Sequence, residues 1–79
     1  MATLRYFAAA ADAAGTSSQT VEAATLGDLL DAIRAGRSEH FAAVLGRCAL
    51  LVDGARVDDP AAPLGPNATV DVLPPFAGG

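Results

Sequence analysis

The chain has 79 residues, of which 52% are hydrophobic and 18% are charged, and its formal net charge is −4. This length allows one small domain with a single core, and the apolar content excludes an intrinsically disordered chain. The acidic balance, without any basic stripe, excludes the usual features of a nucleic-acid-binding protein and favours a partner with a basic surface.

Membrane and secretory classes are also disfavoured. No apolar run approaches the roughly 20 residues that a membrane-spanning helix needs. The first residues enter a strand pattern without a charged segment followed by an apolar one, so we expect no signal peptide and a cytoplasmic location. Cys48 is the single cysteine, which excludes an internal disulfide and agrees with a reducing compartment. All five basic residues are arginines, so building chains through side-chain amines is chemically excluded.

The first element in chain order is a strand. Residues 3–7, TLRYF, alternate in polarity, which places Leu4 and Tyr6 on one face and Arg5 and Phe7 on the other. We therefore expect the first pair to be buried and Phe7 to face outward.

A short helix and a second strand follow. Residues 8–14 are rich in alanine and end at Gly15, which predicts a short helix or turn. Alternation resumes in residues 19–23 and predicts the second strand.

The main helix has the strongest signal in the sequence. Thr25 is a suitable N-cap, Asp28 lies in the first turn, and apolar residues recur at helical spacing before Gly36, namely Leu26, Leu29, Leu30 and Ile33. Ser38 can cap a further short helix that ends at Gly46, with Phe41, Val44 and Leu45 on its apolar stripe.

Three strands are predicted in the second half of the chain. Residues 48–52, CALLV, predict a buried strand, and Asp53-Gly54 is a hairpin-turn signal that leads to a return strand at residues 55–57. After a turn-rich segment, residues 69–73 predict a last strand, with two valines inward and Asp71 and Leu73 outward.

This order of elements predicts an α+β fold. A mixed sheet of about five strands with one main helix and short additional helices on one face is the layout of the ubiquitin-like β-grasp. We expect the β-grasp domain to cover residues 1–73 and a flexible C-terminal tail to cover residues 74–79.

The first segment that resembles a known family is residues 4–16, LRYFAAAADAAGT, and the second is residues 63–79, PLGPNATVDVLPPFAGG. The first resembles the opening of the small subunit of molybdopterin synthase, a member of the ubiquitin-like sulfur carriers. The second resembles that family's closing pattern of Pro-Leu, a turn, a strand and Pro-Pro-x-x-Gly-Gly. The turn before the last strand departs from the family's frequent Gly-Asp, although Asn67 tolerates the positive φ that such turns require. A terminal Gly-Gly also occurs in protein modifiers and in thiamine-pathway carriers, but Leu-Pro-Pro before it favours the molybdopterin branch.

The resemblance implies a carrier that is not an enzyme on its own. The carboxylate of Gly79 would be adenylated by an adenylyltransferase that resembles the ubiquitin-activating enzyme, at the expense of ATP, and converted to a thiocarboxylate. The tail would then enter the large subunit of molybdopterin synthase and donate sulfur to a pterin precursor, with two carriers per dithiolene in a heterotetrameric complex. No cofactor is expected on the isolated chain.

The tail residues suit this chemistry. Glycine at positions 78 and 79 has no Cβ, so Gly78 and Gly79 can pass a narrow channel and leave the carbonyl open to attack. Two prolines favour extended geometry and lower the entropy lost on insertion, so the six residues after Leu73 can project on the order of 20 Å. The expected insertion segment is Pro74, Pro75, Phe76, Ala77 and Gly78.

A docking face is expected beside the tail. Phe7, Leu73 and Phe76 would form its apolar part, with Arg5 and Arg56 at its polar edge. The open alternatives are that Phe76 folds back onto the sheet and that Phe7 and Leu73 pack under a covering loop.

The remaining reactive residues have ordinary interpretations. Cys48 is expected to be a small buried hydrophobic residue, His40 to be solvated, and Asp58-Asp59 to shape a turn. One histidine and one cysteine cannot build a zinc site, and no catalytic group is identified. The other functions left open are a sulfur carrier for thiamine or cysteine biosynthesis and a ubiquitin-like protein modifier that conjugates Gly79 to lysines.

Overall fold

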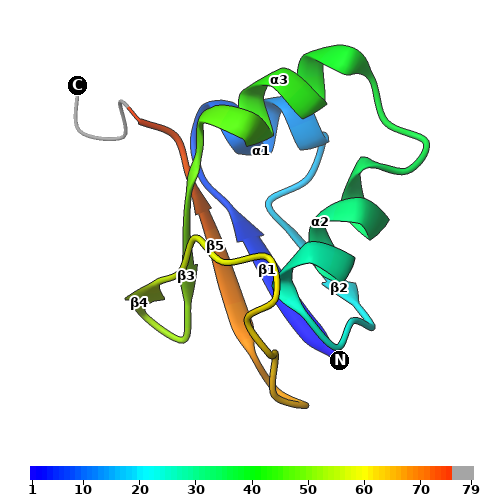
Figure 1. Cartoon of the computed structure of the whole chain (residues 1–79). Helices are drawn as coiled ribbons and strands as arrows, with labels where there is room; N and C mark the ends of the chain where they lie inside the picture. The colour runs from blue at the N-terminus through cyan, green and yellow to red at the C-terminus, as the bar shows by residue number, and fades with distance from the viewer. Residues whose placement is uncertain (76–79) are drawn as a thin grey trace.

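The computed structural model describes residues 1–75 as a five-stranded mixed sheet with three helices (Figure 1). The sheet order is β2-β1-β5-β3-β4, in which β1 and β5 are parallel and the other pairs are antiparallel. The predicted α+β arrangement is confirmed. The elements in chain order are β1 (Ala2–Tyr6), α1 (Ala9–Ala14), β2 (Ser18–Val21), α2 (Leu26–Arg34), α3 (Glu39–Arg47), β3 (Ala49–Val52), β4 (Ala55–Arg56) and β5 (Thr69–Leu73).

The core lies between the two central strands and the helices. Alternation in β1 and β5 turns three side chains of β1 and two of β5 toward the helices, and Leu4, Val70 and Val72 are completely buried. They pack in one cluster with the predicted apolar residues of α2 and α3, of which Leu26, Leu29, Ile33, Phe41 and Leu45 are buried. The two central strands therefore have one covered face, and the side chains between these positions point to the opposite, open face.

Both predicted helix N-caps are present. The Thr25 hydroxyl accepts a hydrogen bond from the Asp28 amide at 3.2 Å, and the Ser38 hydroxyl accepts one from the Phe41 amide at 3.1 Å. Gly15 ends α1 with φ of 77°, in the left-handed region that glycine adopts without a steric penalty.

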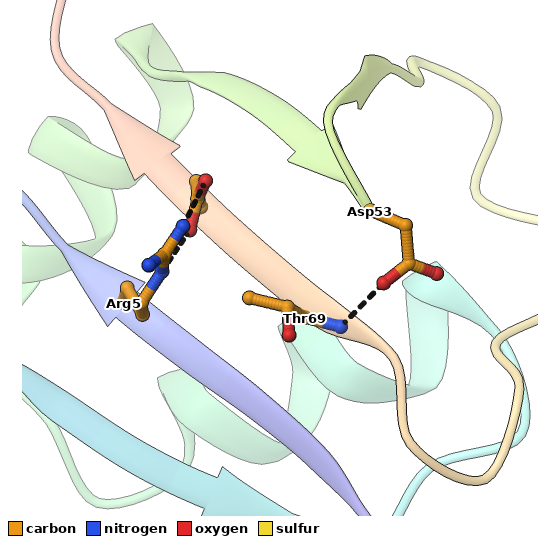
Figure 2. A network of polar contacts seen from close by, with 4 residues as sticks. Arg5, Asp53 and Thr69 are labelled. Atoms are coloured by element: carbon orange, nitrogen blue, oxygen red, sulfur yellow. Dashed lines mark hydrogen bonds and ion pairs between the residues drawn. The ribbon is translucent and has the colours of Figure 1, made fainter.

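The predicted hairpin turn joins β3 to β4. Asp53 and Gly54 have φ angles of 50° and 89°, as the two central residues of a type I′ turn require. The Asp53 carboxylate also accepts a hydrogen bond from the Thr69 amide at 2.9 Å, and the Asp53 amide donates to the Thr69 carbonyl at 2.8 Å (Figure 2). The hairpin is thus tied to the start of β5.

Three local predictions need correction. The strand predicted at residues 48–52 begins at Ala49 and is half-buried on both of its faces, and its edge partner β4 has only two residues. Cys48 is instead the C-cap of α3. The residues of positive φ among the described ones, apart from glycines, are Ala8 and Asp53, so Asn67 does not use the left-handed conformation that it tolerates.

A polar cluster that the sequence did not predict closes the edge of the core near β2. The Tyr6 hydroxyl donates to the Gln19 side-chain oxygen at 2.9 Å, and the Arg37 guanidinium donates to the same oxygen at 2.7 Å. Arg37 also donates to the Ala14 carbonyl and lies 4.8 Å from the centre of the Phe41 ring. One side chain therefore joins α1, β2 and α3.

Candidate functional site

The candidate site is the end of the sheet at which β5 stops. Because β1 and β5 are parallel, their C-terminal ends meet at the edge of the sheet away from Met1 (Figure 1). The Phe7 amide donates a hydrogen bond to the Val72 carbonyl at 3.2 Å, so the segment after β1 stays bonded to β5 almost to the end of that strand. Pro74 and Pro75 follow, and the expected modification site Gly79, with Phe76, Ala77 and Gly78, lies outside the described residues.

Phe7 and Leu73 lie at this edge of the sheet. Tyr6 is paired with Val72 in the parallel register, so Phe7, directly after β1, and Leu73, the last residue of β5, occupy the next position along the two segments. Phe7 is 38% exposed and Leu73 is half-buried. The pair provides an apolar contact directly beside Pro74, where the tail begins.

Arg5 lies next to this pair on the open face. Its guanidinium binds both carboxylate oxygens of Asp71, at 2.6 and 2.9 Å, across the β1–β5 register (Figure 2). The hydrogen bonds and the charge of Asp71 raise the pKa of Arg5 above its ordinary value. The guanidinium carbon is 5.9 Å from the centre of the Phe7 ring. Arg5 therefore gives the apolar pair a polar border, and its carboxylate partner Asp71 was missed by the sequence analysis.

Arg56, the second expected border residue, lies elsewhere. It is on β4 opposite Leu51, and Leu51 is in turn opposite Asp71, so β3 and β5 separate Arg56 from β1. At about 4.8 Å per strand, this is on the order of 14 Å from β1. Arg56 is 3.5 Å from Asp58. The structure thus brings Phe7, Leu73 and Arg5 together and leaves Arg56 at the far side of the open face.

The other side chains with reactive groups, those of Cys48, Asp59 and His40, lie in surroundings that are typical of structural or solvated residues. The Cys48 thiol donates to the Val44 carbonyl at 3.2 Å, and burial raises the pKa of this thiol, which disfavours the reactive thiolate. Asp59 accepts a hydrogen bond from the Ala61 amide at 2.9 Å, as expected of a turn residue, and His40 is exposed. Within residues 1–75, no three potential ligands gather into a metal site.

A location inside a membrane would require a helix that can span the bilayer. In the part of the chain that the structure describes, no helix combines the length and the apolarity needed to cross a bilayer.

Comparisons with known proteins place these features in a family. The model of the ThiS family matches residues 4–79, which includes the whole tail. Comparison with curated protein sequences finds no match.

Solved structures share the fold at low sequence identity. SAMP1 from Haloferax volcanii superposes with a TM-score of 0.82 at 24% identity, over 99% of this chain and 98% of that one. The structure described as putative subunit 1 of the molybdopterin-converting factor from Pyrococcus furiosus superposes with a TM-score of 0.81 at 24% identity, over 94% of this chain and 95% of that one. A chain in the complex of subunits 1 and 2 of that factor from Helicobacter pylori superposes with a TM-score of 0.77 at 23% identity, over 99% of this chain and 97% of that one. The chain belongs to the ThiS family and has the ubiquitin-like β-grasp fold.

Proposed function

We propose that this chain is a sulfur carrier of molybdenum cofactor biosynthesis and that it acts through the C-terminal carboxylate of Gly79. The observation that carries the proposal is the sequence Leu-Pro-Pro-Phe-Ala-Gly-Gly placed directly at the end of β5, inside the family match. The complex of two converting-factor subunits from Helicobacter pylori supports a large-subunit partner.

The chemistry requires an exposed α-carboxylate and two successive partners. The Gly79 carboxylate attacks the α-phosphate of ATP and releases pyrophosphate, which gives an acyl adenylate on the activating adenylyltransferase. A sulfide equivalent then displaces AMP and leaves a thiocarboxylate. In the large subunit, the sulfur passes to the pterin precursor and water restores the carboxylate, so this chain ends each cycle unchanged.

The fold supports this chemistry by holding the base of the tail and presenting its end. Leu73 is the last residue of β5 and is paired with Ala49 of β3. From Pro75, the four remaining residues can reach at most about 13 Å at roughly 3.3 Å per residue. A partner must therefore contact the end of the sheet while it holds Gly79.

The apolar pair beside the tail is the proposed contact. Phe7 and Leu73 would be buried against the large subunit together with Phe76, and Arg5, already neutralised by Asp71, would border the contact. A paired arginine can enter an interface with less desolvation of uncompensated charge than a free one. Arg56 would contribute only to a partner that spans the open face.

A second function is favoured by a specific observation. The Haloferax volcanii neighbour, also named small archaeal modifier protein 1, shares the fold, so a protein modifier that forms amide bonds through Gly79 is the alternative. Carriers of the thiamine and cysteine pathways would share the thiocarboxylate step and differ in the acceptor of sulfur.

The proposal is tested by moving the carboxylate. Deletion of Gly79, or extension by one residue, should abolish dithiolene formation in vitro with the activating enzyme, the large subunit, ATP and a sulfur source. Both variants should melt like the wild-type chain, because the change lies beyond the periodic apolar positions of the sequence that form the core. Full activity of a folded chain without Gly79 would refute both the carrier and the modifier.

A further inference from the structure

A small apolar hollow lies on the helix side of the tail base, away from the Phe7–Leu73 pair. Its lining consists of Ala9 at the start of α1, Val44 and Arg47 of α3, and the two prolines Pro74 and Pro75. Its volume is about 130 Å³, close to that of an apolar cavity that accepts a benzene-sized molecule. The hollow can therefore hold one apolar side chain.

Arg47 differs from the other arginines of the chain. Arg5, Arg34 and Arg56 each have a carboxylate partner, and Arg37 donates to Gln19 and Ala14. Within residues 1–75, Arg47 takes part in no ion pair or side-chain hydrogen bond, and it is exposed.

We propose that the large subunit covers this hollow, inserts an apolar side chain between α1, α3 and the prolines, and places a carboxylate on Arg47. The inference rests on the proposed function. A channel that receives the tail must surround its base, and on the helix side the base is bordered by the hollow.

The charge of Arg47 determines the chemistry of the partner. A guanidinium that is desolvated without a partner is strongly unfavourable, so a subunit that covers the hollow must supply an acceptor, and a carboxylate matches the guanidinium in charge and geometry. The chain as a whole is acidic, with nine acidic side chains against five arginines. An acidic group on the large subunit would be repelled by most of the surface of this chain and attracted at Arg47. The pair would therefore fix the orientation in which the large subunit receives the tail.

Two pairs of variants test the apolar and the charged part separately. Ala9→Leu should fill the hollow, and its control Ala42→Leu adds the same side chain at an exposed position on the opposite side of α3 from Val44 and Arg47. Arg47→Glu should replace attraction by repulsion, and its control Arg34→Glu makes the same change in the last turn of α2. Both arginines lie in the last turn of a helix, so both changes remove a favourable helix-dipole interaction, and Arg34→Glu also removes the exposed ion pair with Asp31.

Binding is measured by calorimetry with the purified large subunit of molybdopterin synthase from the same organism, at low and high salt. We expect Ala9→Leu and Arg47→Glu to weaken binding at least about tenfold and the controls less than about threefold, with the effect of Arg47→Glu reduced by salt. Thermal melts of all four chains establish that they are folded.

The results that would contradict the inference differ from those that would contradict the proposed function. Unchanged binding of folded Ala9→Leu and Arg47→Glu would overturn this inference alone. Slower adenylation with unchanged large-subunit binding would assign the hollow to the activating enzyme. Failure of the wild-type chain to bind the large subunit at all would instead refute the proposed function.

Discussion

The two faces of the central strands β1 and β5 differ in nearly every property. On the covered face, Leu4, Val70 and Val72 have no exposed surface and pack against the helices. On the open face, the same strands carry the Arg5–Asp71 ion pair, and the arginine side chain is 54% exposed. Neighbouring residues of one strand thus have separate tasks: one set holds the fold, and the other is available to a partner.

Substitutions on the two faces should therefore have different effects. Changes on the covered face should act through stability, and changes on the open face beside the tail should act through binding.

The largest effect is expected in the core. Leu29→Ala removes a completely buried side chain of α2 and should lower the free energy of unfolding by about 2–5 kcal/mol, because it leaves a cavity. Leu73→Ala on the open face, a half-buried position, should cost about 1 kcal/mol. Urea denaturation of both chains measures the difference, and equal losses would contradict the separation of the two faces.

The second effect concerns binding. Phe7→Asp should weaken the complex with the large subunit by about 2 kcal/mol or more, because it puts a charge into the centre of the proposed apolar contact. The melting temperature should change little, since Phe7 already contacts solvent. Thr20→Asp is the control, because Thr20 is exposed on β2. Normal binding of Phe7→Asp, or its unfolding, would show that this face is not the interface.

The third effect depends on pH. Burial raises the pKa of Tyr6 above its ordinary value of 10.0, so the folded state favours the neutral phenol. The corresponding stability is fully present below pH 10.0 and is lost as the pH rises through the folded-state pKa. Tyr6→Phe should cost about 1 kcal/mol near neutral pH, because its hydrogen bond to Gln19 is lost.

The measurement is a series of denaturation curves from neutral to alkaline pH. The wild-type chain should lose stability more steeply than Tyr6→Phe, while the contribution of Cys48, whose pKa burial also raises, remains in both chains. Parallel curves would mean that Tyr6 does not titrate differently in the folded and unfolded states.

The smallest effect lies at the junction of the two regions. Ala8 directly follows Phe7 and has φ of 50° and ψ of −124°, a conformation that strains any residue with a Cβ. Ala8→Gly should therefore stabilise the fold by about 0.5 kcal/mol, after the entropic cost of glycine. Ala42→Gly, inside α3, should destabilise it by about 1 kcal/mol. Calorimetric melts compare the two, and a loss of stability in Ala8→Gly would show that the residue is not strained.

Much of the fold could be predicted from local patterns. Thr25 and Ser38 are caps whose side chains act on the next turn, and the alternation around Leu4 and Val70 reports one covered face. These features depend on neighbours in sequence, and the structure confirms them. The parallel pairing of β1 with β5 agrees with the expected β-grasp and gives Phe7 and Leu73 their common edge.

What the sequence missed depends on residues far apart in the chain. The Arg5–Asp71 pair joins residues 66 positions apart, and the Arg37 contacts span 18 and 23 positions. The hollow at Arg47 exists only because two helices and the end of β5 converge there. No periodic pattern reports such meetings, so the polar partners of the candidate site could be found only in three dimensions.

The proposed transfer of sulfur through Gly79 can be followed by the intact mass of the full chain after incubation with its activating enzyme, ATP and a sulfide source. We expect a gain that equals the exchange of one oxygen for sulfur, lost again when the large subunit and the pterin precursor are added. A chain whose mass does not change, or which is recovered only in amide-linked conjugates with other proteins, would contradict the proposed transfer.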